Sequence, residues 1–258
     1  SACVIGEKIY VFGGYEERGG YRRQSQCFSR DVYVLDIKTM RWSHPYVFGE
    51  PASWRDFHTA TAVGKNMYIF GGRGDVLGGL HSNQEVYDNQ VMVFDTETYT
   101  WHPLVADGIL PVGRRSHSAV AYGQSIYLFG GYNNIERQHY GDILKFDTDT
   151  GQWSTIVVPG EYPCARRRHC CCLAGDKAVI FGGSSPIHGV QSEDESFLQD
   201  HNDLYVLDLN PSLKTLCKLA VVKYTLYDEL LPQTLKREIA LMLPKTSLRT
   251  QYSSLSQG

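Results

Sequence analysis

The sequence has no long hydrophobic run, and no apolar stretch approaches the 18 residues that suggest a membrane-spanning helix. The first residues, SACVIGEKIYVFGG, lack the basic start and small-residue cleavage site of a secretory signal peptide. A large positive charge is also missing, because 25 basic and 28 acidic side chains give a net charge of -3. These absences predict no membrane span and disfavour direct binding to nucleic acid or anionic membranes. We therefore expect a cytoplasmic or nuclear protein.

The cysteines suit neither a disulfide framework nor a zinc site. The chain has seven, an odd number, and Cys170, Cys171 and Cys172 are consecutive. Disulfide-rich domains use an even number of spaced cysteines, and zinc sites commonly use CxxC pairs. We expect reduced thiols, no metal and no cofactor. A nucleophile elbow, a P-loop, an HExxH motif and a carboxylate pair are also missing, so the sequence predicts a non-catalytic protein.

One unit of strands and turns repeats along the 258 residues. Four apolar runs, IYVFGG, MYIFGG, IYLFGG and AVIFGG, end in a glycine doublet, and successive doublets are 58, 59 and 52 residues apart. The doublets are Gly13–Gly14, Gly71–Gly72, Gly130–Gly131 and Gly182–Gly183. Periods of this length are typical of propellers and other repeat architectures.

Each unit contains further short segments of alternating polarity. A run closed by an acid follows every doublet, and a tryptophan follows the first three of these runs: Trp42, Trp101 and Trp153. Before each of the later three doublets a histidine opens another run: His58, His117 and His169. Alternation without helical periodicity predicts four short β-strands in each unit.

This pattern resembles the kelch repeat, in which a glycine doublet follows the second strand and a tryptophan lies on the fourth. The resemblance implies an all-β fold, a kelch β-propeller whose blades pack through the tryptophans. Residues 1–208 provide about four blades, the first incomplete, where such propellers have about six. We therefore expect an N-terminally truncated fragment that forms an open arc with unpaired edges.

The long loops of the blades should share one face with the connections between blades, because strands alternate in direction within a blade. These loops span residues 15–30, 73–90, 132–141 and 184–202. The connections carry a repeated RxxH motif that supplies Arg55, Arg114 and Arg166. Long loops on a rigid scaffold commonly carry binding sites, so this face is the predicted functional face.

Blade symmetry places the RxxH arginines around the axis, with further arginines beside them: Arg73, Arg115, Arg167 and Arg168. Guanidinium groups bind carboxylates through two parallel hydrogen bonds, so the set predicts an anion site. In the alternative interpretation, the arginines pair with rim acids and recur only because the blades do; the acids are Asp31, Asp142 and Asp203. We interpret the histidines as links between blades and the CCC run as core packing.

The segment after Asp208 changes to a helical pattern. Asn210 and Pro211 form a helix start, and a second helix is expected from about Pro232 to Met242. Leu213, Cys217 and Val221 lie at helical spacing and resemble a BC box, the motif that binds elongin C. Leu231, Pro232 and Leu235 resemble a cullin-2 box. The alternative is that this amphipathic segment packs against the propeller. Residues 209–243 form the predicted adaptor segment, and residues 244–258 a mobile tail.

Together these features resemble the kelch-domain substrate receptors of cullin-2 ubiquitin ligases. The resemblance implies binding of elongin B/C and cullin-2, and recognition of C-terminal degrons that end in glycine. From the family's motif, Arg114 is the first candidate for the degron carboxylate, with Arg115 and Arg55 as neighbours. The candidate pocket rim consists of Trp54, Arg73, Tyr132, Tyr140 and Arg166.

Three questions stay open at this point. A kelch scaffold that binds actin, chromatin or a signalling partner would have the same repeat. Blades absent from this sequence could contribute to the pocket. Because the sequence ends in Gly258, the tail of one copy could enter the pocket of another.

Overall fold

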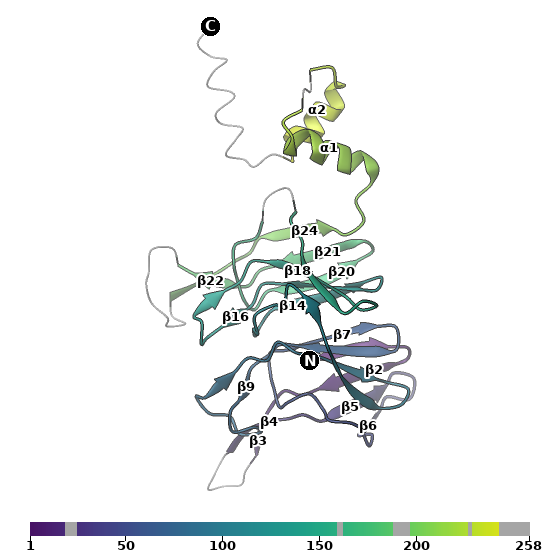
Figure 1. The fold of residues 1–258 in the computed structure, drawn as a ribbon, viewed down its shortest axis with the longest axis vertical. Coiled ribbons are helices and arrows are strands. Elements are labelled where there is room, and N and C mark those ends of the chain that lie inside the picture. Colours follow the sequence, from purple (N-terminus) through teal and green to yellow (C-terminus); the bar gives the residue numbers. More distant parts are fainter. Residues whose placement is uncertain (19–24, 159–161, 188–196, 227–228, 243–258) are drawn as a thin grey trace.

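The computed structural model describes residues 1–18, 25–158, 162–187, 197–226 and 229–242. Within them, the chain forms four blades of a β-propeller and two short helices (Figure 1). None of the described helices is long and apolar enough to cross a membrane. The predicted all-β kelch propeller is confirmed.

Each blade is an antiparallel sheet whose strands follow the order of the chain. Blade 1 has β1 (Ala2–Ile5), β2 (Lys8–Phe12), β5 (Val32–Asp36) and β6 (Arg41–Ser43). Blade 2 has β7 (Thr59–Val63), β8 (Asn66–Phe70), β11 (Val91–Asp95) and β12 (Thr100–Leu104). Blade 3 has β14 (Ser118–Tyr122), β15 (Ser125–Phe129), β18 (Ile143–Asp147) and β19 (Gln152–Thr155), with β13 (Asp107–Gly108) parallel to β19. Blade 4 has β20 (Cys170–Ala174), β21 (Lys177–Phe181) and β24 (Leu204–Asp208).

The long loops are themselves ordered as small hairpins between the second and third strands of each blade. These hairpins pair β3 (Tyr15–Arg18) with β4 (Ser25–Phe28), β9 (Gly74–Asp75) with β10 (Glu85–Val86), β16 (Tyr132–Asn133) with β17 (Gln138–His139), and β22 (Ser184–Pro186) with β23 (Leu198–Asp200). They extend from one side of the blades (Figure 1). The predicted functional face is therefore a set of hairpins held on a rigid scaffold.

Tryptophans join the blades as predicted, except at the beginning of the arc. The ring of Trp101 in blade 2 lies 4.9 Å from that of Phe12 in blade 1, and the ring of Trp153 in blade 3 lies 5.2 Å from that of Phe70 in blade 2. Trp42 is 58% exposed, because no described blade lies against β6. At the other end Phe181, which corresponds to Phe12 and Phe70, is 50% exposed. The four blades thus form an arc with two open apolar ends.

The prediction that the CCC run packs in the core is wrong for two of its three cysteines, because they lie at this open end of the arc. Cys171 packs against the cluster of Phe129, Ile143 and Ile180, but Cys170 and Cys172 are exposed. Successive side chains of a strand point to opposite faces, and one face of blade 4 has no described neighbour. All seven cysteines are free thiols.

Two conditions on the backbone require the glycine doublet. Gly71 and Gly72 have φ angles of +65° and +95°, which side chains other than glycine rarely adopt. A Cβ on Gly71 would lie 2.5 Å from the carbonyl oxygen of Arg114 in the next blade, and one on Gly72 would lie 2.6 Å from that of Asp56. The doublet therefore lets strand 2 touch both its own blade and the following one.

The histidines link neighbouring blades, which confirms their structural interpretation. His117 Nε2 lies 3.0 Å from Thr59 Oγ1, and His169 Nε2 lies 2.7 Å from Ser118 Oγ. Burial lowers the pKa of His117 to about 3, and the positive charge of Arg114 acts in the same direction. Burial likewise lowers the pKa of His169 to about 4. These imidazoles are neutral in the folded protein near neutral pH.

The two helices follow blade 4 and lie beyond β24 (Figure 1). Helix α1 (Leu213–Lys223) has Ser212 as its N-cap, whose Oγ accepts a hydrogen bond from the Thr215 N–H at 3.2 Å. The predicted helix start at Asn210 and Pro211 is therefore two residues too early. Helix α2 (Gln233–Ala240) begins after Pro232, close to the prediction.

Removal of a tryptophan that lies between blades should lower the free energy of unfolding far more than removal of the tryptophan at the open end. Trp153→Ala leaves a cavity against Phe70, and we expect the free energy of unfolding to fall by about 3–5 kcal/mol. Trp42→Ala, the matched control, should change it by less than about 0.5 kcal/mol. Urea titrations of both variants measure the difference. Equal losses would contradict the assignment of Trp153 as a contact between blades.

The buried histidines predict a loss of stability in acid. The folded pKa of His117 is below its ordinary value of 6.5, so stability is fully present above that value and is lost as pH falls toward about 3. His117→Gln should make the free energy of unfolding fall less steeply, by about 1.4 kcal/mol per pH unit between about pH 6 and 4. Urea titrations at several pH values measure both slopes. Parallel slopes would show that His117 does not remain neutral.

Candidate functional site

The first arginine of each RxxH motif is buried at the centre of its own blade. Arg55, Arg114 and Arg166 are each 1% exposed. Arg114 donates from Nη1 to the carbonyl oxygen of Gly130 at 3.2 Å, from Nη2 to Asp142 Oδ2 at 3.0 Å, and from Nε to the carbonyl oxygen of Val112 at 3.1 Å. Each of its nitrogens therefore has a partner inside the protein.

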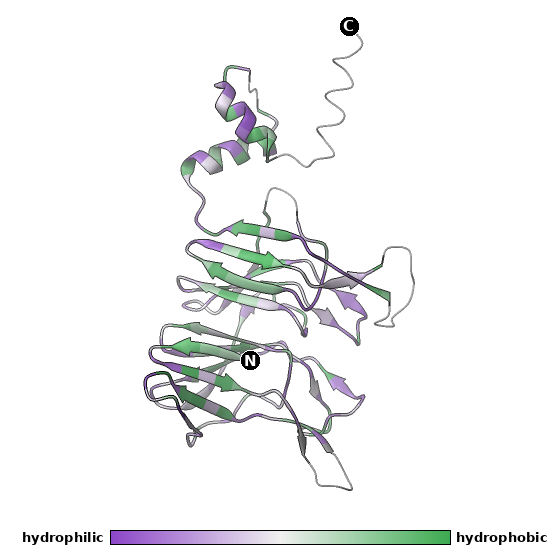
Figure 2. Ribbon diagram, turned by 180° about the vertical axis from the view of Figure 1, so that it is seen from behind, coloured by the Kyte–Doolittle hydropathy of each residue, from purple (hydrophilic) through white to green (hydrophobic). Residues whose placement is uncertain are grey.

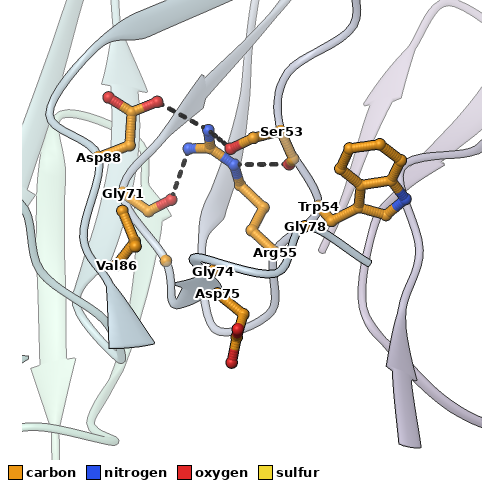
Figure 3. A pocket seen from close by; sticks show the side chains of 10 residues that line it. Ser53, Trp54, Arg55, Gly71, Gly74, Asp75, Gly78, Val86 and Asp88 are labelled. Atoms are coloured by element: carbon orange, nitrogen blue, oxygen red, sulfur yellow. Dashed lines mark hydrogen bonds and ion pairs between the residues drawn. The ribbon is translucent and has the colours of Figure 1, made fainter. Parts of the chain in front are cut away.

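The other two blades repeat this arrangement. Arg55 donates to the carbonyl oxygen of Gly71 at 2.8 Å and to Asp88 Oδ2 at 2.9 Å, as Figure 3 shows. Arg166 donates to the carbonyl oxygen of Gly182 at 2.9 Å and to Asp203 Oδ2 at 2.9 Å. Each guanidinium thus connects the entry to a blade with the blade's second and third strands. This geometry matches the alternative in which the arginines pair with acids and recur because the blades do.

These bonds argue against Arg114 and Arg55 as ligands of a substrate carboxylate. Binding would require a guanidinium to leave its aspartate, and a buried unpaired charge costs several kcal/mol. Arg166, predicted at the rim, is equally occupied. The acid of blade 1, Asp31, differs from the other two predicted acids: its Oδ2 accepts a hydrogen bond from Ser29 Oγ at 3.2 Å.

The residue that follows each buried RxxH arginine in the sequence pairs with a residue of the long-hairpin face. Isolated β-bridges pair Asp56 with Arg73, Arg115 with Tyr132, and Arg167 with Ser184. In each pair the first residue follows the RxxH arginine, and the second follows a glycine doublet. The repeat therefore brings Arg115 and Arg167 to equivalent places in successive blades, whereas Arg73 occupies the other side of the bridge, the place that Tyr132 and Ser184 take in the later blades.

Arg115 and Arg167 lie over Tyr132, and Arg73 is linked to Arg115 through a shared carboxylate. We call Arg73, Arg115, Arg167 and Tyr132 the mouth cluster. The Cζ atoms of Arg167 and Arg115 lie 4.5 and 5.6 Å from the centroid of the Tyr132 ring. Arg73 and Arg115 approach the same carboxylate oxygen, Glu85 Oε1, at 3.0 and 3.4 Å. Arginines from successive blades thus approach one another here, but they are not the first arginines of the RxxH motifs.

Burial shifts the pKa values of two groups that lie beside the mouth cluster, Asp56 and His139. Burial raises the pKa of Asp56 to about 6, although the charges of Arg73 and Arg115 oppose the rise. Burial, and then the charge of Arg167, lowers the pKa of His139 to about 4. The His139 ring lies 4.5 Å from that of Tyr132. Guanidiniums held in a poorly solvated, partly aromatic environment favour the capture of an anion.

Trp54 forms the wall of a separate cavity of about 110 Å³ (Figure 3). The floor of this cavity contains the Arg55–Asp88 pair, and its lining includes Gly74, the residue after Arg73. Arg30 lies over the Trp54 ring on a cation–π contact, with Cζ 3.9 Å from the centroid. Gly78 beside the indole has a φ of +72°, a backbone conformation that side chains other than glycine rarely adopt. The cavity can accept a small apolar group beside the mouth cluster.

Tyr140 lies elsewhere than predicted from the loop sequence. Its ring stacks with Arg114, with Cζ 3.9 Å from the ring centroid, and its hydroxyl donates to Glu136 Oε2 at 2.8 Å. Burial and the Glu136 hydrogen bond raise the pKa of Tyr140. Tyr140 therefore supports the structural pair of blade 3, whereas Tyr132 and Arg73 belong to the mouth cluster.

Sequence reasoning did not single out Glu85, Tyr87 or Ser184. The hydroxyl of Tyr87 donates to Glu85 Oε2, and this bond holds the carboxylate between Arg73 and Arg115. Ser184 pairs with Arg167. A signal for Ser184 was available: like Arg73 and Tyr132, it directly follows a glycine doublet.

The predicted adaptor surface is a helix that the propeller does not cover. No residue of α1 is buried; Leu213 is 76% exposed, Cys217 is exposed, and Val221 is half-buried. Lys214 and Lys218 each bond Glu238 of α2 at 3.0 Å. Figure 2 shows mixed hydrophobic and hydrophilic residues along this helix pair. This exposure argues against the alternative that α1 packs against the blades.

The second predicted box lies at the start of α2. Leu231 and Leu235 are half-buried, and Pro232 is exposed. The whole predicted C-terminal tail, residues 244–258, lies outside the described residues, so its proposed entry into a pocket stays a prediction.

A family model for the KLHDC2/KLHL20/DRC7 Kelch-repeats domain matches residues 1–183 and 75–223 of the chain. The chain belongs to the kelch-repeat family. Human Kelch domain-containing protein 3 is 48% identical over 248 residues, which are 96% of this chain and 63% of that protein. Mouse Kelch domain-containing protein 1 is 32% identical over 206 residues, which are 70% of this chain and 47% of that protein.

The fold comparison agrees with the family. A solved structure titled "Structure of YjhT" superposes with a TM-score of 0.62 at 14% identity, covering 82% of this chain and 68% of that one. This likeness concerns the fold alone. The chain spans less than two thirds of the length of Kelch domain-containing protein 3, and kelch-repeat propellers of this family are generally non-catalytic.

Proposed function

We propose that this kelch-repeat protein is a non-catalytic substrate-recognition subunit of a cullin-2 ubiquitin ligase, and that its propeller binds the free C-terminus of proteins ending in glycine. The observation that carries this proposal is the mouth cluster: Arg115 and Arg167 from two successive blades lie over the Tyr132 ring, and Arg73 of the preceding blade shares Glu85 with Arg115. Ubiquitin transfer belongs to the assembled ligase, since the propeller recognises substrate only.

A peptide C-terminus suits the mouth cluster because it is an anion at the end of a chain. Arg115 and Arg167 flank Tyr132, so a carboxylate there can accept hydrogen bonds from two guanidiniums. Hydrogen bonds to charged groups contribute roughly 1.5–3 kcal/mol each. A terminal glycine lets the carboxylate approach closely, because no Cβ meets the surrounding rings.

The cavity beside Trp54 gives a place for a side chain upstream of the terminal glycine. Its lining begins one residue after Arg73, and its walls are the indole and glycines. A small apolar side chain fits this cavity better than a charged one, because the charged groups in its lining, Arg55 and Asp88, already bond each other.

The exposed face of α1 supports the second half of the proposal. Leu213 and Cys217 are one helical turn apart and open to solvent, and Val221 continues the stripe. An apolar helix face of this kind docks into a groove of a partner through residues at i, i+4 and i+8. In the proposal the partner is elongin C, with elongin B and cullin-2 completing the ligase.

Binding of a glycine-ended peptide should depend on the second arginines. In the full-length protein, Arg115→Ala and Arg167→Ala should each weaken binding about tenfold or more, because each removes a charged hydrogen bond. Lys replacements at the same positions, which keep the charge but lose the bidentate geometry, should recover affinity only in part. Fluorescence anisotropy with the peptide and with its C-terminally amidated form measures this effect.

The amidated peptide is the matched control for the charge of the terminus. It should bind weakly to the unmodified protein and be insensitive to Arg115→Ala. Equal affinity for the acid and the amide would refute carboxylate recognition. The result would also separate the proposal from a scaffold for actin, chromatin or signalling partners, which needs no free C-terminus.

Leu213→Asp should abolish co-purification of elongins B and C without unfolding the blades. Leu213 is 76% exposed, so the change removes an apolar anchor from the surface and leaves the core intact. Lys223→Asp at the end of the same helix is the control for an added negative charge. Thermal unfolding should match in all three proteins. Retained elongins with Leu213→Asp would show that α1 is not the adaptor surface.

A further inference from the structure

A second group of reactive side chains lies in an open cavity of about 370 Å³ on the hairpin face between blades 3 and 4. The cavity is lined by Arg137 and His139 of one blade and by Cys164, Ser185 and Ile187 of the connection and hairpin that follow. His139 also contacts Tyr132, so the cavity adjoins the mouth cluster. Cys164 is exposed to it.

Cys164 is positioned between a base and a cation. Its Sγ lies 3.5 Å from His201 Nε2, and it accepts a hydrogen bond from Arg166 Nη2 at 3.3 Å. The same nitrogen, His201 Nε2, also lies 2.8 Å from Ser185 Oγ. A nucleophile within reach of a base is the arrangement that activates a thiol.

The repeat shows that the thiol is not needed to build the blade. The residue at the corresponding position of blade 2 is Ser53, whose Oγ accepts from Arg55 Nη2 at 2.7 Å. In blade 3 it is Val112, which offers Arg114 only its carbonyl oxygen. A hydroxyl, or no side-chain acceptor at all, therefore supports the buried arginine. The Cys164 sulfur supplies chemistry that the fold does not require.

We propose that Cys164 is a modification site that undergoes exchange with small anionic disulfides, of which glutathione disulfide is the probe. His201 takes the proton of the Cys164 thiol, and the thiolate attacks one sulfur of the disulfide. A bond forms between Sγ and that sulfur while the original S–S bond breaks. The other half leaves as a thiolate and takes the proton from His201. The protein thiol is oxidised to a mixed disulfide, and the leaving half is reduced to a free thiol.

The cavity favours an anionic disulfide over a neutral one. Arg137 lines the cavity. The carboxylates of glutathione match this positive charge. The inference does not rest on the proposed ligase role, because it concerns residues that neither the mouth cluster nor α1 uses.

Three exposed cysteines of the same chain are internal controls for the reaction. Cys170, Cys172 and Cys217 are, like Cys164, exposed free thiols. After brief exposure to glutathione disulfide, peptide mass spectrometry should find Cys164 modified at least tenfold faster than these three. The uncharged disulfide of 2-mercaptoethanol should show a smaller preference for Cys164.

Substitutions at His201 and Ser185 show whether these neighbours, and not exposure alone, make Cys164 reactive. His201→Gln should slow modification of Cys164 about tenfold and leave the rate at Cys217 unchanged. Ser185→Ala, which removes the second partner of His201 Nε2, should change the rate at Cys164 and provides a second test if His201→Gln unfolds. Cys164→Ser, which introduces the hydroxyl that Ser53 provides in blade 2, should keep the thermal stability and lose the fast site. Equal rates at the four thiols, or a Cys164 rate that is unchanged in both variants, would overturn the proposal.

Discussion

The buried arginine–aspartate pair of blades 2, 3 and 4 is the interaction on which the hairpin face depends. Arg55, Arg114 and Arg166 each hold the entry to a blade against the carbonyl oxygen of a glycine doublet and against an aspartate before the third strand. A charge so deeply buried is tolerable because every donor has an acceptor. Once this arginine is fixed, the next residue pairs with the residue after the doublet, and its side chain is aimed at the mouth.

The repeat made most of the fold predictable. Doublets, tryptophans and histidines occupy fixed places, so strand order and the contact of Trp101 with Phe12 follow from spacing. The different roles of Arg114 and Arg115 could not be predicted from the repeat. Two adjacent arginines are equivalent in composition, and only the bridge of Arg115 with Tyr132 and the bond of Arg114 with Asp142 distinguish them.

The C-terminal segment shows a similar limit. The spacing of Leu213, Cys217 and Val221 predicted a helix with an apolar stripe, and α1 contains it. Periodicity alone does not say whether such a stripe faces a core or solvent. In the structure, two lysines of α1 share Glu238 of α2, and this small polar contact leaves Leu213 outward. Exposure is a tertiary property, which here depends on how two short helices meet.

The contact between blades has a direction. Trp101 and Trp153 each face a phenylalanine of the preceding blade, Phe12 and Phe70. Trp42 and Phe181 are the corresponding side chains at the two ends of the arc, and both are half exposed or more. Blade 2 thus offers a tryptophan to the blade before it and a phenylalanine to the blade after it, so the order of the repeats along the chain fixes the order in which the blades pack.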